Sequence, residues 1–374
     1  MPEDELTALL TLNRIEGLGC TGARYLYEQL GSAQEIFRRR DHLKDLIPGI
    51  DTHVIDALCG FGYDSFIREE LDFIEKHGIR CVTIADSDYP ARLLDCKDAP
   101  LVLFSLGNVN YNAARSVGIV GTRKATEYGR RMCRTFVKEL HELCPDITIV
   151  SGLAYGIDIE SHKAAVEVGL PTIGVLAHGL DMIYPSAHRP IAKAMLSDGG
   201  LVTEFMSRTA PLGPNFVRRN RIIAGLSDAV VVVESAAKSG SLITAEIAGS
   251  YNRECFAFPG SVGDPYSVGC NELIRDNRAS LITSAFDMVN AMNWNDRMPK
   301  GKAVQKELFP NLTDDEEKVY KRVMLKAQGV HIGTLMTELN IPFPHLSTIL
   351  FSLEMKGLIQ QCPGSLCKPL YFAQ

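Results

Sequence analysis

The sequence has 374 residues, of which 46% are hydrophobic and 22% charged, and its formal net charge is -6 at pH 7. This composition excludes a chain that is disordered throughout, and the length corresponds to two or three domains of roughly 100–200 residues. The negative charge excludes a uniformly basic nucleic-acid binder, so any affinity for DNA has to come from a local basic patch.

The ten cysteines are scattered singly, with no C-x-x-C pair and no histidine at zinc-ligand spacing. We therefore predict no metal site, no cofactor and a reducing, cytoplasmic location. The first residues are acidic, unlike a signal peptide, and no apolar run approaches the ~18 residues of a membrane span. We expect no membrane association.

Residues 1–77 predict a helical domain, because leucines recur at helical spacing from Leu6 to Leu10. Residues 17–22 (GLGCTG) match the dinucleotide-binding string, but that motif requires a strand before it, and here the preceding pattern is helical. We interpret the glycines as a turn of a SAM-like or helix-hairpin-helix domain, with a degraded copy at residues 47–50. Whether such a turn contacts DNA phosphates or only joins two helices stays open.

Residues 78–294 alternate short apolar runs with helical stretches, the runs being 117–120, 147–150, 172–176, 229–233 and 255–258. Near-continuous apolar strands are typical of a parallel sheet that is buried on both faces. The pattern predicts an α/β domain with an extended Rossmann-like, doubly wound, mainly parallel sheet.

Residues 295–312 are polar and contain two prolines, which favours a linker. From Thr313 to residue 374, helical patterns followed by a small hairpin predict a winged helix. Thr313 and Glu316 have the spacing of a capping box. Because residues 313–374 hold six basic and six acidic side chains, we expect this domain to serve protein contacts or regulation rather than major DNA binding.

Small residues follow several predicted strands, at the edge where an open α/β sheet binds ligands. Such residues let a backbone approach an anion at a helix start. The candidates are Gly121, Thr122, Arg123, Ser151, Gly152, Gly179, Lys238, Ser239, Gly240 and Ser241. Walker A spacing is absent, which argues against an NTPase. Asp158 and His162, four residues apart, favour a buried capping and orienting pair over an acid/base pair.

Residues 205–227 contain no acidic residue but hold Arg208, Arg218, Arg219 and Arg221. This asymmetry predicts a local positive patch, with Asn220 and Phe216 among the arginines, where Phe216 could stack on bases. The alternative at this point is a helix start with solvated arginines and a core phenylalanine.

Six segments, taken in order, resemble the DprA (Smf) DNA-processing family: SVGIVGTR, IVSGLAYGID, GLDMIYP, NFVRRNRIIAGLSDAVVVVE, KSGSLITA and FAFPG. The resemblance covers residues ~80–290, and the flanking domains match less specifically. It implies a homodimer, without known catalysis, that binds and protects single-stranded DNA during natural transformation and loads the RecA recombinase onto it.

The resemblance also implies roles for individual residues. Arg123 grips the DNA backbone, Lys238–Ser241 form a phosphate loop, and Phe216, Arg219, Asn220 and Arg221 belong to the family's N-F-P-x-R-N-R motif. Two positions depart from the pattern: Val217 stands where proline is expected, and Tyr155 stands where arginine is common.

Two other functions compete with this one. The related phosphoribohydrolases of the same Rossmann-like superfamily use a glutamate, and Glu246 lies at a roughly similar place after a loop that lacks their double glycine. A protein-interaction scaffold with vestigial anion loops is the other alternative. We expect apolar residues between 247 and 282 to form the homodimer surface.

Overall fold

The computed structural model describes residues 4–15, 17–60, 65–294, 312–326, 329–356, 358–362 and 365–369. The chain divides into two compact units, Met1–Asp296 and Arg297–Gln374. The predicted linker lies outside the described residues except for its last position. None of the helices in the described ranges is long and apolar enough to cross a membrane.

The N-terminal part of the first unit is helical, as predicted. Glycines with positive φ occupy the turns that the sequence singled out: Gly17 (82°) between the first two helices, Gly19 (61°) at the first residue of the second, and Gly49 (82°) farther on. These turns join helix to helix, so residues 17–22 are not a dinucleotide loop. The helices are α1 (Glu5–Asn13), α2 (Gly19–Leu30), α3 (Ala33–Arg38), α4 (Leu43–Leu46), α5 (Thr52–Gly60) and α6 (Ser65–His77).

These helices share one core with the sheet that follows. Leu9, Leu26 and Ile67 are buried in the same cluster as Val102 and Phe104 of the second strand. The helical part is therefore packed onto the sheet within one compact unit.

A nine-stranded sheet forms the centre of this unit, in the order β1-β2-β6-β5-β4-β3-β7-β8-β9. The pairs β1–β2 and β2–β6 are antiparallel and all others are parallel, which confirms the mainly parallel sheet. The strands are β1 (Arg80–Thr83), β2 (Val102–Gly107), β3 (Arg115–Val120), β4 (Ile147–Ser151), β5 (Thr172–Val175), β6 (Gly200–Thr203), β7 (Ala229–Val232), β8 (Glu254–Ala257) and β9 (Ser280–Leu281).

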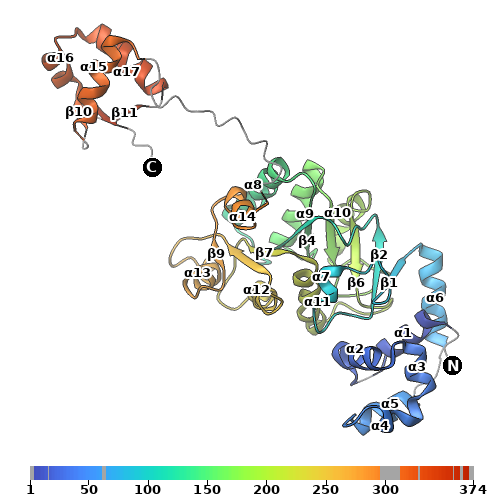
Figure 1. Cartoon of the computed structure of the whole chain (residues 1–374). Helices are drawn as coiled ribbons and strands as arrows, with labels where there is room; N and C mark the ends of the chain where they lie inside the picture. The colour runs from blue at the N-terminus through green and yellow to red at the C-terminus, as the bar shows by residue number, and fades with distance from the viewer. Residues whose placement is uncertain are drawn as a thin grey trace. The chain divides into compact units, whose positions relative to one another are not determined.

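Helices cover both faces of the sheet (Figure 1). One face packs on α8 (Glu127–Leu143), α9 (Ile157–Val168) and α14 (Ala285–Ala291), with α10 (Arg189–Ala194) beside α9. The other packs on α7 (Ala91–Leu94), α11 (Gly213–Leu226), α12 (Gly240–Ser250) and α13 (Val268–Arg275).

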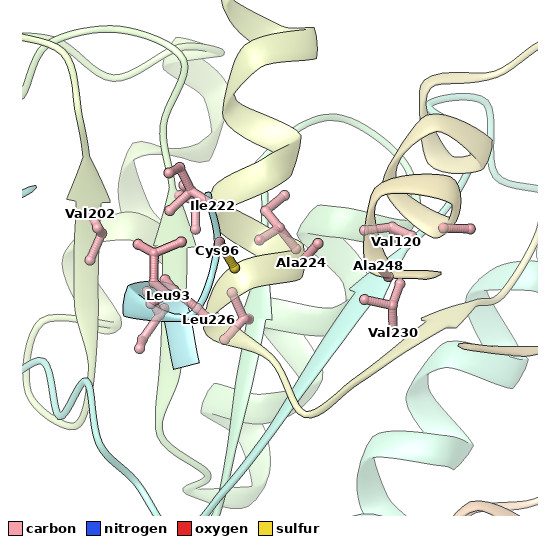
Figure 2. Close-up of a cluster of buried hydrophobic side chains, with 14 of the residues drawn as sticks. Leu93, Cys96, Val120, Val202, Ile222, Ala224, Leu226, Val230 and Ala248 are labelled. Atoms are coloured by element: carbon pink, nitrogen blue, oxygen red, sulfur yellow. The ribbon is translucent and has the colours of Figure 1, made fainter. Parts of the chain in front are cut away.

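Alternate strand residues supply the two cores. Ile119 points to the α8 side, whereas its neighbour Val120 belongs to the α11 side. Figure 2 shows side chains of α11, among them Ile222, between Val202 of β6 and Val230 of β7. Residues on both faces of these strands are therefore buried, as the apolar runs predicted.

The winding direction reverses at β3. The chain leaves β3 through α8 on one face and later returns through α11 on the other face to β7, which pairs with β3 on its other side. The loops that follow β3 and β7 therefore lead to helices on opposite faces of the sheet. The position between these two strands is the topological switch point, where doubly wound sheets bind ligands.

The second unit is a winged helix. Its elements are α15 (Asp314–Met324), β10 (Val330–His331), α16 (Ile332–Leu339), α17 (Phe343–Met355), β11 (Ile359–Cys362) and β12 (Leu366–Pro369). The three strands pair antiparallel in the order β10-β12-β11. The capping box is present in both directions, because Thr313 Oγ1 accepts from Glu316 N–H and the Glu316 carboxylate accepts from Thr313 N–H.

Replacing Glu316 by glutamine is expected to destabilise this unit and to remove part of its sensitivity to acid. Bonds from Lys356 Nζ (2.6 Å) and Ser352 Oγ (2.5 Å) and the Thr313 N–H lower the pKa of Glu316 to about 2. A carboxylate with a lowered folded-state pKa stabilises the fold above its unfolded pKa of about 4.3, and that stabilisation is lost as the pH falls toward 2.

Hydrogen exchange of the α15 amides in the full chain measures this effect. Glu316→Gln should accelerate exchange about tenfold at pH 7 and flatten its pH dependence between about pH 5 and 2. The matched control is Glu317→Gln, which removes an exposed ion pair with Lys321 and should change little. Equal effects of the two variants would contradict the prediction.

Candidate nucleic-acid interface

A cavity of about 620 Å³ lies beyond the carboxyl ends of β3 and β7. Its walls come from the β3–α8 loop, the start of α9, the first turns of α11 and the loop that opens α12. Ten of the fifteen predicted DNA contacts line it: Gly121, Thr122, Arg123, Phe216, Arg219, Asn220, Lys238, Ser239, Gly240 and Ser241. The fold thus brings together loops and helix starts that are far apart in the sequence.

Three exposed cations line this cavity, in addition to the buried Arg219. Arg123, Lys124 and Lys238 are exposed, and within the described ranges none of them forms an ion pair. The first turn of α12 adds to this positive character, because Ser239 occupies the N-cap position without making a side-chain cap. Uncapped N–H groups at a helix start, next to free cations, suit an anion such as a phosphate.

An aromatic ring stands among these cations. Phe216, half-buried in the first turn of α11, has the guanidinium carbon of Arg123 4.9 Å and that of Arg219 5.9 Å from its ring centroid. The sequence left open whether Phe216 is a core residue, and the structure places its side chain in the cavity lining.

Arg219 is a buried residue of the cavity lining that hydrogen-bonds to the backbone of two strand ends. Its side chain is 3% exposed, and its Nη1 donates to the carbonyl oxygens of Gly152 (2.5 Å) and Val175. Burial lowers the pKa of Arg219 to about 10, and its Nε has no hydrogen-bond partner among the described residues. Arg219 therefore holds the ends of β4 and β5 in place while its guanidinium lines the cavity.

Asp158 contributes the one carboxylate found in the described lining. Burial raises its pKa, against the opposing effect of the nearby Arg219 guanidinium. The predicted pairing with His162 is wrong, because His162 Nδ1 shares a hydrogen bond with Thr172 Oγ1 at 2.7 Å and Gly156 caps α9. Asp158 instead lies in the cavity lining, and its carboxyl accepts backbone hydrogen bonds from Ala154 and Gly152.

The arginines of residues 205–227 do not form one exposed patch, because acidic partners outside this range, Glu204 directly before it and Glu69 in α6, bind them. Arg221 is buried and donates to Glu204 at 2.5 Å, and Arg218 donates to the same carboxylate at 2.7 Å. Arg208 pairs with Glu69 at 2.7 Å. Segment composition therefore overestimated the free positive charge.

Five predicted contacts lie outside the cavity lining: Ser151, Gly152, Gly179, Arg218 and Arg221. Ser151 Oγ donates to the carbonyl of Ile119 in the interior. A Cβ on Gly152 would lie 2.4 Å from Arg219 Nη1, and one on Gly179 would lie 2.5 Å from Met206 O. Close packing inside the protein, rather than approach of an anion, requires these two glycines.

Sequence reasoning did not select Lys124, although it directly follows Arg123. Nor did it select Tyr184, whose ring lies against Phe216. Lys124 could have been selected from its position next to Arg123. Tyr184 could not, since no sequence pattern connects residue 184 with residue 216.

Two family models match the chain. Residues 80–293 match DNA recombination-mediator protein A, and residues 306–365 match the DprA winged helix domain. Protein Smf from Escherichia coli is 37% identical over 310 residues, covering 80% of this chain and 79% of that protein. Protein Smf from Synechocystis is 30% identical over 399 residues, covering 97% of this chain and 98% of that protein.

Two solved structures are similar as well. The X-ray structure of DNA processing protein A from Streptococcus pneumoniae has a TM-score of 0.63 and 32% identity, covering 76% of this chain and 97% of that one. A structure of DNA processing protein A from Helicobacter pylori, described for its single-stranded DNA binding mode, has a TM-score of 0.52 and 28% identity, with coverages of 58% and 96%.

Proposed function

Because the chain belongs to the DNA recombination-mediator protein A family, we propose that it binds and protects single-stranded DNA and loads the RecA recombinase onto that strand during natural transformation. The single observation that carries the proposal is the cavity itself. Arg123, Lys124 and Lys238 supply positive charge without partner carboxylates in the described chain, beside the ring of Phe216.

This combination favours a single strand over a duplex. Cations and a helix start bind the backbone of either form, whereas an aromatic ring stacks only on a base that is unpaired and turned outward. The Helicobacter pylori relative is described as binding single-stranded DNA, which supports the same ligand here.

Family membership is the basis for the remaining parts of the proposal. We propose that the protein acts in the cytoplasm as a homodimer whose surface includes apolar residues between 247 and 282. We propose domains at residues 1–77, 78–294 and 313–374, the last serving protein contacts or regulation.

We also propose that the protein is not an enzyme. Glu246, the counterpart considered for a phosphoribohydrolase glutamate, is exposed on α12 and is not part of the cavity lining. The carboxyl of Asp158 accepts hydrogen bonds from the backbone of Ala154 and Gly152, which fix its position. The position of Glu246 outside the lining and the backbone bonds to Asp158 support this part of the proposal.

Fluorescence anisotropy with an oligothymidylate and a duplex of equal length tests the proposal. The full chain should prefer the single strand, and Phe216→Ala should weaken that complex about tenfold, the effect of losing one base–aromatic stack. Phe286→Ala removes a phenylalanine that is 49% exposed on α14, outside the cavity lining, and is the matched control. Equal affinity for both DNA forms, or release of free base from nucleoside monophosphates, would overturn the proposal.

A further inference from the structure

A second aromatic side chain lies beside Phe216. Tyr184 comes from the loop between β5 and the short 3-10 helix Ser186–His188, a segment unrelated in sequence to α11. The two ring centroids are 6.0 Å apart and the ring planes are inclined by 60°. Tyr184 is 47% exposed. Nearly half of the Tyr184 surface is therefore accessible to solvent, beside a residue that lines the cationic cavity.

Buried groups hold the loop of Tyr184 in position. Burial lowers the pKa of His178, which favours the neutral form of its ring. His178 Nδ1 bonds to the carbonyl of Gly179 at 2.8 Å, so its Nε2 is free to accept from the backbone N–H of Tyr184 at 3.3 Å. Thr203 Oγ1 in turn donates to the His178 carbonyl. An exposed aromatic ring on a braced loop is preorganised for contact with a ligand rather than for packing.

We propose that Tyr184 is a second base-stacking platform, so that the site binds two consecutive unpaired bases of a single strand, one on Phe216 and one on Tyr184. This inference rests on the proposed function and identifies which part of the DNA the site recognises. Every base has a π-face, so the platform recognises unpaired bases of any sequence.

The ring geometry says how the two bases lie. A base inserted between two parallel rings requires them roughly 7 Å apart, twice the ~3.4 Å spacing of stacked bases. The observed separation is smaller and the planes are inclined, so no base fits between Tyr184 and Phe216. Each ring therefore offers its own face, and the two bases are splayed apart, a geometry that neither a duplex nor a stacked strand can adopt.

Stacking by Tyr184 is separable from a hydrogen bond between its hydroxyl and a phosphate. Two ligands of equal length are compared on the full chain: an oligothymidylate, and an oligonucleotide of abasic residues that keeps the phosphates. The variants are Tyr184→Ala, Tyr184→Leu, which keeps apolar bulk, and Tyr184→Phe, which removes only the hydroxyl. Phe216→Ala and Lys238→Ala serve as references for a base contact and a backbone contact.

We expect Tyr184→Ala and Tyr184→Leu each to weaken oligothymidylate binding about tenfold and to leave abasic binding within about twofold. Tyr184→Phe should behave as the wild type. Tyr25→Ala, at an exposed tyrosine of α2, should leave the preference for bases unchanged. Lys238→Ala should weaken both ligands equally.

Three outcomes would overturn the inference: wild-type affinities in Tyr184→Ala, equal losses on both ligands, or a loss in Tyr184→Phe as large as in Tyr184→Ala. If the wild type binds neither ligand, the proposed function itself fails. If Phe216→Ala loses the preference for bases and Tyr184→Ala does not, only the second platform fails.

Discussion

Replacing Arg123, Lys124 and Lys238 together by glutamine is expected to weaken binding of single-stranded DNA about a hundredfold at 0.1 M salt. These are the exposed cations of the cavity lining, and none has an ion-pair partner in the described parts of the chain. Each phosphate contact to a single strand contributes ~0.7 to the slope of log K against log salt concentration. Loss of three contacts should therefore reduce the slope of log K against log salt concentration by about two. Over the tenfold range from 1 M to 0.1 M salt, this slope corresponds to about a hundredfold in affinity.

Titrations of an oligothymidylate at several salt concentrations measure both quantities. The matched control replaces one arginine and two lysines elsewhere, Arg131, Lys97 and Lys193, which are exposed and absent from the cavity lining. It changes the net charge equally and should alter the slope by well under one unit. If both triple variants lose the same affinity, binding depends on overall charge rather than on this cavity.

Replacing Arg221 by methionine is expected to lower the free energy of unfolding by about 3–5 kcal/mol, the usual effect of removing one partner of a buried ion pair. The side chains of Arg221 and Glu204 are 6% and 2% exposed and 2.5 Å apart. Arg221 also donates to the carbonyl of Asp98. Without Arg221, the half-exposed Arg218 is the one cation left beside Glu204 among the described residues, so its buried charge is poorly compensated.

Urea denaturation, followed on the transition of the unit Met1–Asp296, measures the effect. Arg218→Met is the matched control, because it removes a bond to the same carboxylate from a side chain that is 47% exposed; it should lower the free energy of unfolding by about 1 kcal/mol or less. The double variant Arg221→Met/Glu204→Leu should recover most of the lost stability. Wild-type stability with weakened DNA binding in Arg221→Met would instead make Arg221 a DNA contact.

The strands that the sequence predicted are parallel strands with mostly apolar residues, whereas the antiparallel strand β2 was missed although Val102–Phe104 are apolar and buried. β3, β4, β5, β7 and β8 lie in the middle or the parallel half of the sheet and are buried on both faces. β6 was missed because only Leu201 and Val202 are apolar in it, between Gly200 and Thr203. β9 has two exposed residues, and β1 is only partly buried, so neither carries a strong hydrophobic pattern.

The capping box of the winged helix was predictable from four residues, because its hydrogen bonds join Thr313 to Glu316 within one helical turn. The loops after β3 and β7 were predictable for a similar reason, since small residues between an apolar run and a helix are visible in one window. Spacing alone failed for Asp158 and His162, which face different surroundings although they lie one turn apart on α9.

Local sequence was therefore sufficient for the doubly wound sheet, the winged helix and the loops that meet at the cavity, since hydrophobic periodicity and helix starts depend on residues close together in the chain. Which cations remain free was decided by the tertiary structure alone. Arg218 and Arg221 are neutralised by Glu204, which directly precedes their acid-free segment and reaches them through the fold, while Arg123 and Lys238 have no such partner in the described chain. Opposite charges cancel over a few ångströms in space, whatever their separation in sequence, so only the fold determines where the positive surface lies.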